Sequence, residues 1–167
     1  SAAKAAVYDI AFGYDELEAA EGPESNKIEG ITGTASAYDA NEGAAAENAF
    51  DGDYGSYFAT PAGGNVADQY LIADLGTEYT IDQVNYTQRY DATQQYNCTG
   101  NLLNYVIEVS TDNTTWTKVS EGATVAGTTE ITFDPVAARY VKLTSTSSYH
   151  WQESSANTVM TVAELEV

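Results

Sequence analysis

Cysteine, histidine and basic residues are all scarce in this chain of 167 residues. Cys98 is the single cysteine and His150 the single histidine, so no intramolecular disulfide can form and no cysteine-rich zinc site can be built. These absences exclude most metalloprotease and thiol-enzyme mechanisms. A chain of this length buries about 70% of its unfolded surface, so we expect it to fold as one domain without such cross-links.

Positive charge is the second scarcity. Lysine and arginine number 6 against 25 aspartates and glutamates, which gives a formal net charge of −19 at pH 7. This charge repels phosphate backbones and anionic headgroups, so we expect no nucleic acid and no membrane surface among the partners. No apolar run reaches the roughly 18 residues of a membrane helix. The sequence begins at Ser1 rather than Met, so we expect a piece of a longer protein.

Short segments rich in Tyr, Val, Ile and Thr alternate with turn residues from about residue 65 onward. In segments 70–75 and 105–110 the apolar side chains recur at every second residue, as in a half-buried strand. The pattern predicts an all-β antiparallel sandwich. We expect further strands at 115–117, at 131–133 with an end at Pro135, at 139–144 and at 159–167.

The first thirty residues differ in composition, because acidic residues crowd among alanines there before a Gly22-Pro23 step. Segment 14–20 could form one or two helical turns, and segment 6–12 could instead be an extra edge strand within an acidic linker. We expect residues 1–27 to be an N-terminal extension or linker and residues 28–167 to be the domain.

The segment 48–56, Asn-Ala-Phe-Asp-Gly-Asp-Tyr-Gly-Ser, has the composition of a loop that binds a hard cation. Calcium takes six to eight oxygen ligands, and glycine lets the backbone turn so that carbonyls and side chains converge. The spacing does not fit the calcium loop of helix-loop-helix hands, which needs a glutamate at its twelfth position. A tight Asx-turn without a metal is the alternative that composition leaves open.

Seven short motifs occur in an order that resembles the discoidin, or coagulation factor V/VIII type C, family. They are Ala49–Asp53, Tyr70–Gly76, Tyr86–Arg89, Asn104–Ser110, Asn113–Trp116, Ala138–Leu143 and Ala163–Val167. The chain is most similar to bacterial family 32 carbohydrate-binding modules, which are appended to secreted or surface glycan-degrading enzymes. The resemblance implies a jelly-roll β-sandwich of about eight strands. It also implies an extracellular, non-catalytic and monomeric module of a multidomain protein.

A structural calcium ion is the next implication of the resemblance. Carried over to this sequence, the carbonyls of Asn48 and Asp53, the carboxylate of Asp51, and the hydroxyl and carbonyl of Ser56 would bind it. Ser56 stands where the family usually has threonine, which keeps the oxygen. The full set of expected ligands is Asn48, Asp51, Asp53, Ser56, Ala163 and Glu164.

The resemblance places a sugar site on loops at one end of the sandwich, and Arg89 matches its usual arginine. An arginine fork suits vicinal hydroxyls or a carboxylate, although Arg89 could equally be a salt-bridge partner. Ala59 occupies the position that usually carries histidine, and the usual Asn-Gly step is Thr99-Gly100. These departures shift the expected ligand from galactose toward N-acetylated sugars such as N-acetylhexosamines.

Aromatic and polar residues of the same loops are further candidates for sugar contacts. Trp151 is the preferred stacking platform, because the polar segment 147–152 around it offers no hydrophobic core for its ring. For each aromatic, packing under a loop is the competing role. The candidates beside Arg89 are Phe58, Tyr90, Tyr96, Asn97, Asn101, Tyr149, His150 and Trp151.

Three functions are compatible with these observations. The first is a glycan-binding module, and the second is a protein-binding or adhesion domain of the same family. The third is a small carbohydrate-active enzyme that uses a carboxylate pair, with Asp51, Asp53, Asp74 and Glu108 as available acids. Against the enzyme, no G-x-S-x-G motif is present and His150 is the only histidine base.

Overall fold

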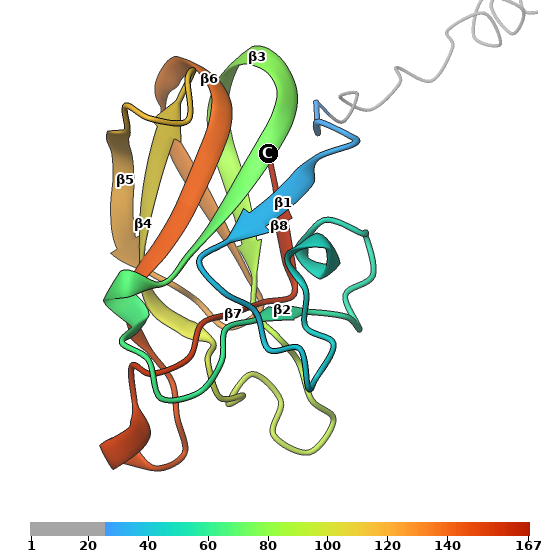
Figure 1. Cartoon of the computed structure of the whole chain (residues 1–167), viewed down its shortest axis with the longest axis vertical. Helices are drawn as coiled ribbons and strands as arrows, with labels where there is room; N and C mark the ends of the chain where they lie inside the picture. The colour runs from blue at the N-terminus through green and yellow to red at the C-terminus, as the bar shows by residue number, and fades with distance from the viewer. Residues whose placement is uncertain (1–25) are drawn as a thin grey trace, which may run out of the picture.

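A computed structural model describes residues 26–167 and shows an almost entirely β domain (Figure 1). The strand at 6–12 and the helical turns at 14–20 expected from the sequence lie outside the described residues. The strands are β1 (Thr32–Ala35), β2 (Phe58–Ala59), β3 (Tyr70–Thr87), β4 (Leu102–Ser110), β5 (Thr117–Ala123), β6 (Thr128–Ser148), β7 (Thr161–Val162) and β8 (Glu164–Glu166). Three short 3-10 helices lie between them, namely η1 (Ala46–Ala49), η2 (Val66–Asp68) and η3 (Glu153–Ser155).

The strands form an antiparallel six-stranded sheet and a separate pair. The sheet has the order β1-β3-β6-β4-β5, and β8 also pairs with β3, while β2 pairs with β7. The long strands β3 and β6 bend together at the upper end of Figure 1. The first half of β3 pairs with β1 and its last residues pair with β8, so the bend makes two layers from one sheet. This is the β-sandwich expected from the sequence.

The alternation in the sequence gives the core its residues. Leu71 and Ala73 of β3, Ile107 of β4, and Val141 and Leu143 of β6 are fully buried between the layers. Leu71, Ala73 and Ile107 occupy the faces that the period of two predicted for segments 70–75 and 105–110. The predicted division into an inner and an outer face is therefore confirmed.

The expected end of a strand at Pro135 is wrong, because β6 continues through this residue to Ser148. The β3–β6 register shifts between Ile81, which faces Val136, and Gln83, which faces Thr132. Residues 133–135 consequently have no partner in the ladder, and a proline that lacks an N–H breaks no ladder hydrogen bond there. The expected strand at 159–167 is also split, into β7 and β8.

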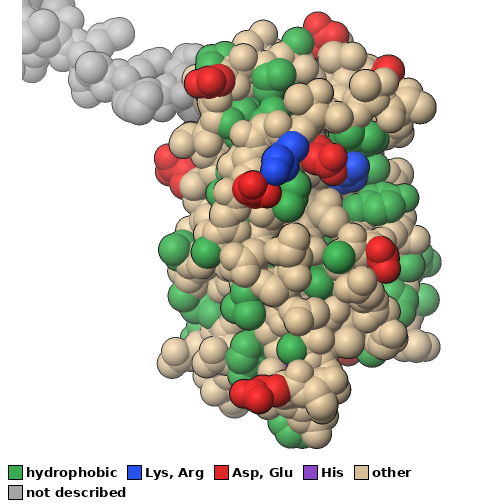
Figure 2. Space-filling view, turned by 90° about the vertical axis from the view of Figure 1, so that its left-hand side faces the viewer, with side chains coloured by type: hydrophobic (Ala, Val, Ile, Leu, Met, Phe, Trp, Pro, Cys, Tyr) green, Lys and Arg blue, Asp and Glu red, His purple; other side chains and the backbone are tan. Residues whose placement is uncertain are grey.

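The surface is polar, with few basic groups. Figure 2 shows the β5 side of the domain, where hydrophobic side chains are scattered in small groups and the basic side chains lie beside acidic ones. Lys118 pairs with Glu121 at 3.0 Å, and Lys142 pairs with Glu108 at 2.7 Å. Within residues 26–167, no helix is long and apolar enough to cross a membrane.

Candidate functional site

Two loops project from the end of the sandwich opposite the β3–β6 bend (Figure 1). One, residues 88–101, joins β3 to β4, and the other, residues 149–160, joins β6 to β7. They are joined at their bases, where the Gly100 N–H donates to the Tyr149 carbonyl at 2.8 Å and the Tyr149 N–H donates to the Asn101 carbonyl at 2.8 Å. The backbone of Tyr149 thus joins the second loop to the first.

Asn101 is a positioning residue within the first loop. Its side chain is 1% exposed. Its amide oxygen accepts from the Arg89 N–H at 2.9 Å, and its amide nitrogen donates to the carbonyls of Arg89 and Tyr96, each at 2.8 Å. The expectation that Asn101 touches a ligand is therefore wrong, because its polar atoms are buried and already bonded to the protein.

Arg89 presents its guanidinium at this end of the domain. The guanidinium carbon lies 4.0 Å from the centre of the Tyr57 ring, and the Tyr57 hydroxyl donates to Glu42 at 2.7 Å. Within residues 26–167, no carboxylate lies within 4.0 Å of the Arg89 guanidinium. The salt-bridge role left open for Arg89 belongs instead to Arg139, which binds both oxygens of Asp74.

Phe58, which was expected to contact the sugar, is fully buried and belongs to the hydrophobic core. It lies on β2 opposite Val162, so its ring packs inward and cannot reach a ligand. Neighbouring side chains of a strand point to opposite faces, so the outward position belongs to Tyr57. Tyr57 was not predicted from the sequence. It could have been, because an apolar Phe58 that faces the core leaves the preceding residue facing outward.

The first loop also carries an exposed aromatic pair. The rings of Tyr90 and Tyr96 meet edge to face with centroids 5.2 Å apart, and the residues are 55% and 37% exposed. Such a pair is a preferred aromatic geometry, and it leaves ring surface open to solvent. Asn97 follows Tyr96 on the same exposed turn.

Trp151 is the most exposed large hydrophobic residue of the second loop, at 70%. Its ring stacks on His150 with centroids 5.8 Å apart and an angle of 22° between the planes. The Gln152 N–H donates to Nδ1 of His150 at 2.9 Å and fixes that ring. Trp151 thus shares one end of the sandwich with Arg89, although no hydrogen bond or ring contact joins these two described residues.

The loop 48–56 gathers oxygen atoms around Ser56. The Ser56 hydroxyl oxygen lies 2.8 Å from a carboxylate oxygen of Asp51, 3.0 Å from the Asp53 carbonyl and 3.2 Å from the Asn48 carbonyl. One hydroxyl has one proton and can donate to only one of these three acceptors. Four oxygen atoms therefore converge without enough protons between them, which is the arrangement that a hard cation relieves.

Glu164 brings the end of the chain to this loop. It is 1% exposed, and its Oε1 accepts from the Gly52 N–H at 2.8 Å. Burial, with a smaller contribution from the charge of Asp51, raises the pKa of Glu164 to about 7. Burial opposes ionisation of Asp51 as well, but hydrogen bonds from the Asp53 amide and the Ser56 hydroxyl outweigh it and hold its pKa below the ordinary value.

Four of the expected calcium ligands thus lie in loop 48–56, and Glu164 contacts that loop through Gly52. Ala163 directly precedes Glu164, is buried, and donates its N–H to the Thr87 carbonyl at 3.0 Å. Over residues 26–167 there is no group of three or more His, Cys, Asp or Glu side chains that could hold a metal. The loop instead offers two carboxylates together with carbonyl and hydroxyl oxygens. This donor set suits calcium and does not suit zinc.

A broad groove of about 1090 Å³ lies at the other end of the domain, lined by residues that include Tyr79, Ile81, Pro135 and Val167. Of the exposed large hydrophobic residues in the described chain, it contains Tyr79 alone. The aromatic and guanidinium groups that suit a sugar are therefore concentrated at the loop end and not in this groove.

The family model for the F5/8 type C domain matches residues 32–165. The chain therefore belongs to the F5/8 type C, or discoidin, family. Its structural neighbours are family 32 carbohydrate-binding modules.

Three solved structures illustrate this likeness. CBM32-3 from a family 31 glycoside hydrolase of Clostridium perfringens is 22% identical with a TM-score of 0.70, over 81% of this chain and 88% of that one. CpGH89CBM32-5 from Clostridium perfringens, in complex with GalNAc-β-1,3-galactose, is 23% identical with a TM-score of 0.65, over 81% and 93%. The family 32 module of NanJ from the same organism, in complex with galactose, is 23% identical with a TM-score of 0.62, over 82% and 92%. At these identities the likeness shows the fold.

Proposed function

We propose that this domain is a non-catalytic glycan-binding module that holds a larger extracellular glycan-active protein on its glycan. The observation that carries the proposal is the guanidinium of Arg89, which has no carboxylate partner within residues 26–167 and lies at the same end as exposed aromatic rings. A sugar offers an apolar face for stacking and hydroxyls that accept from a guanidinium fork.

The proposed binding surface is open, which sets the expected strength of binding. Tyr90 and Trp151 are both more than half exposed, so each presents a ring that solvent covers in the free protein. An open loop surface immobilises few ligand groups and makes few hydrogen bonds, so we expect dissociation constants in the micromolar to millimolar range per site.

The preferred sugar is an N-acetylated or otherwise substituted one. Two of the solved neighbours bind galactose or GalNAc-β-1,3-galactose. In this chain Ala59 is 3% exposed and offers no side-chain donor where the family usually has histidine. The loop 88–101 supplies Tyr96 and Asn97 as additional contacts for a substituent. We therefore expect N-acetylgalactosamine to bind more tightly than galactose.

Calcium completes the proposal as a structural ion. The residues present fit it, because carbonyl, hydroxyl and carboxylate oxygens converge at Ser56 with too few protons between them. The ion would be held by Asn48, Asp51, Asp53, Ser56, Ala163 and Glu164, and it would supply the positive charge that balances their oxygens. The ion would then join loop 48–56 to the last strand, β8.

The enzyme alternative is disfavoured because the candidate catalytic carboxylates are already bonded to other groups of the protein. Asp74 is bound by Arg139, Glu108 is bound by Lys142, and Asp51 belongs to the oxygen cluster of loop 48–56. A glycosidase needs two carboxyl groups that face one substrate. The adhesion alternative would use the same loop surface to bind a protein instead of a glycan, because exposed aromatic residues on loops also suit a protein interface.

A glycan array probed with the isolated domain tests the proposal, with a parallel assay for released reducing sugar. We expect selective retention on a subset of glycans and no release of sugar. Arg89→Ala should lower the affinity for the retained glycans at least about tenfold, since a hydrogen bond to a charged group contributes about 1.5–3 kcal/mol. Arg139→Ala is the matched control and should bind as the parent does.

Three outcomes would contradict the proposal. A blank array together with capture of a protein partner would assign the domain to adhesion, and release of reducing sugar would assign it to catalysis. Equal binding by the Arg89→Ala and Arg139→Ala variants would place the sugar site away from the loop end.

A further inference from the structure

Glu42, Tyr57 and Arg89 form a chain of contacts that links three separate segments. Glu42 lies in the loop between β1 and η1, Tyr57 immediately precedes β2, and Arg89 follows β3. The Tyr57 hydroxyl donates to Oε2 of Glu42 at 2.7 Å, and the Tyr57 ring lies beneath the Arg89 guanidinium at 4.0 Å. Resting on the proposed glycan-binding function, we propose that Glu42 and Tyr57 are positioning residues that hold Arg89 for neutral sugars and against acidic ones.

The first step is geometric. A guanidinium stacked on an aromatic ring has one face covered, while its N–H donors lie in its plane and stay available at the edge. The backbone of Arg89 is held by the buried Asn101 amide at both its N–H and its carbonyl. Arg89 is consequently held at the backbone by Asn101 and at the head by Tyr57, so less side-chain freedom is lost when a ligand binds.

Glu42 makes the stacking ring itself rigid. A hydrogen bond from a phenol to a carboxylate is charge-assisted and stronger than a neutral one. The Tyr57 side chain is half-buried, and the hydrogen bond to Glu42 at 2.7 Å holds the hydroxyl end of the ring in place. The orientation of the Arg89 plane therefore depends on a residue that does not touch the ligand.

The charges around Arg89 define the class of ligand. Glu42 lies behind Tyr57, and Asp39 is close enough to act on the same tyrosine. On the other side, the positive charge of Arg89 contributes to lowering the pKa of Asp91, after hydrogen bonds from Thr93 and Gln94. Glu42, Asp39 and Asp91 thus lie near the Tyr57–Arg89 pair, and none of the three forms an ion pair with Arg89. Their negative charge would repel the carboxylate of a uronate, whereas a neutral sugar carries no charge to be repelled.

The positioning role is tested first without a ligand, by NMR of the Arg89 Nε–H group. The parent should show a distinct Nε–H signal with a heteronuclear NOE close to that of the backbone. Tyr57→Leu should abolish this order, and Tyr57→Phe, which keeps the ring, should retain most of it. Tyr79→Leu is the control, because Tyr79 is an exposed tyrosine at the other end of the domain. A mobile Arg89 signal in the parent would overturn the positioning role.

The ligand class is tested with galactose, N-acetylgalactosamine and galacturonic acid, titrated by calorimetry or NMR. The parent should bind the neutral sugars at least about fivefold more tightly than galacturonic acid. Tyr57→Leu should weaken binding of the neutral sugars about fivefold, the scale of a lost cation–π contact and lost positioning.

Glu42→Gln separates geometry from charge, because glutamine still accepts from the Tyr57 hydroxyl. It should change the affinity for neutral sugars less than about twofold, while the preference over galacturonic acid falls about threefold. Glu78→Gln, at an exposed site on β3, should leave the preference unchanged.

The outcomes distinguish this proposal from the proposed function. If none of the three sugars and no array glycan binds the parent, the glycan-binding function fails, and the NMR measurement alone decides whether Tyr57 positions Arg89. If Arg89→Ala abolishes binding but Tyr57→Leu does not weaken it, the positioning role is wrong. If galacturonic acid binds the parent as tightly as galactose does, the assigned ligand class is wrong.

Discussion

The side-chain amide of Asn101 hydrogen-bonds to both backbone polar groups of Arg89, accepting from its N–H at 2.9 Å and donating to its carbonyl at 2.8 Å. The same amide oxygen accepts from the Thr161 hydroxyl at 3.0 Å. One buried side chain therefore joins the β3–β4 loop to the strand β7 and holds the residue proposed to bind the sugar.

Replacing Asn101 by alanine should destabilise the domain and disorder Arg89. The change leaves partly buried backbone groups of Arg89 and Tyr96 without partners, and we expect a loss of about 2–3 kcal/mol in the free energy of unfolding. Urea denaturation measures this loss. Asn97→Ala, at an exposed position of the same loop, should change stability by less than about 0.5 kcal/mol. Equal stability of the two variants would show that the amide contacts contribute nothing.

The strands could be predicted from the sequence because their signal is local. Leu71, Ala73 and Ile107 face the core as the alternation of apolar residues requires. The continuation of β6 through Pro135 was mispredicted because residues 133–135 bulge out of the β3–β6 ladder, and a sequence pattern does not show such an irregularity in pairing.

The candidate site was predicted less completely, since its contacts join residues far apart in the chain. Arg89 and Trp151 were found through their chemistry and their place in the motifs. Tyr57 and Glu42 were missed because they reach Arg89 only through the folded arrangement of three loops. Asn101 was predicted to contact the ligand because the sequence does not show that its polar side chain is buried and already hydrogen-bonded to the protein.

Tyr86 supplies a second buried polar connection, and removing its hydroxyl should lower stability. The fully buried hydroxyl accepts from the Leu102 N–H at 2.9 Å and donates to the Thr161 carbonyl at 3.1 Å. Tyr86→Phe leaves both backbone groups unpaired and should lower the free energy of unfolding by about 1–3 kcal/mol. Tyr105→Phe is the control, because its hydroxyl makes only a 3.5 Å contact with Ser120. A loss no larger than that of the control would contradict the assigned role.

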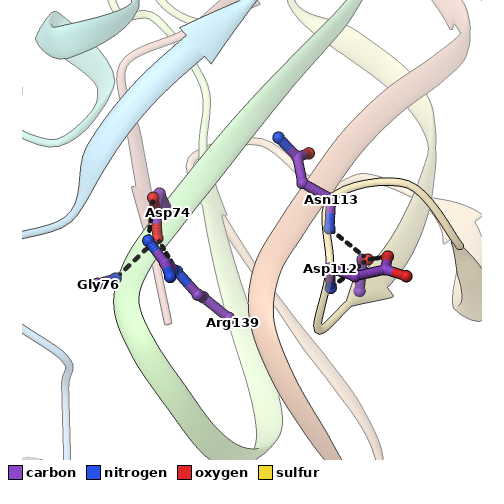
Figure 3. A network of polar contacts seen from close by, with 6 residues as sticks. Asp74, Gly76, Asp112, Asn113 and Arg139 are labelled. Atoms are coloured by element: carbon purple, nitrogen blue, oxygen red, sulfur yellow. Dashed lines mark hydrogen bonds and ion pairs between the residues drawn. The ribbon is translucent and has the colours of Figure 1, made fainter.

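The Asp74–Arg139 pair should make stability depend on pH. Figure 3 shows the side chains of Asp74 on β3 and Arg139 on β6 facing each other. Nε of Arg139 donates to Oδ1 of Asp74 at 3.0 Å, and Nη2 donates to Oδ2 at 3.2 Å. The hydrogen bond from Arg139 holds the pKa of the Asp74 carboxyl below its ordinary value, and the Gly76 N–H adds to this effect.

Because the folded pKa is depressed, the stabilisation is present above the unfolded pKa and is lost as the pH falls through the folded pKa. Asp74→Asn should therefore be less stable than the parent at pH 7, and the difference should shrink below about pH 4. Denaturant unfolding from pH 7 to pH 2 measures it. Asp82→Asn, at an exposed position of β3, is the control. A difference that stays constant with pH would show that the ion pair is not its cause.

Chelation of calcium should lower the melting temperature. A ligand that binds only the native state at 100 times its dissociation constant stabilises it by about 2.7 kcal/mol, which corresponds to about 5–10 °C for a domain of this size. Asp51→Ala should remove the response to calcium and to chelator, whereas Asp82→Ala should keep it. If metal-stripped parent and chelator-treated parent melt together with calcium-loaded parent, loop 48–56 is an Asx-turn and the calcium assignment is wrong.

Trp151 should be the stacking half of the sugar site. Its ring is 70% exposed and held by His150, so a sugar can cover its free face with little rearrangement. Trp151→Ala should weaken binding of the array-selected glycan about tenfold, because both the stacking contact and the buried apolar area are lost. Trp151→Phe should retain part of the affinity, and Tyr79→Ala should retain all of it.

Intrinsic fluorescence can assign this contact to Trp151 directly, since Trp116 is the other tryptophan of the chain. Trp116 is half-buried beneath Lys142, whose ammonium lies 4.4 Å from the centre of its ring, so a ligand on the loops cannot reach it. Titration of the parent with the glycan should shift the emission, and Trp151→Phe should abolish the shift while binding continues. An emission shift that survives in Trp151→Phe would mean that binding perturbs Trp116, and the sugar would then lie on the sheet surface near β4 and β6 instead of on the loops.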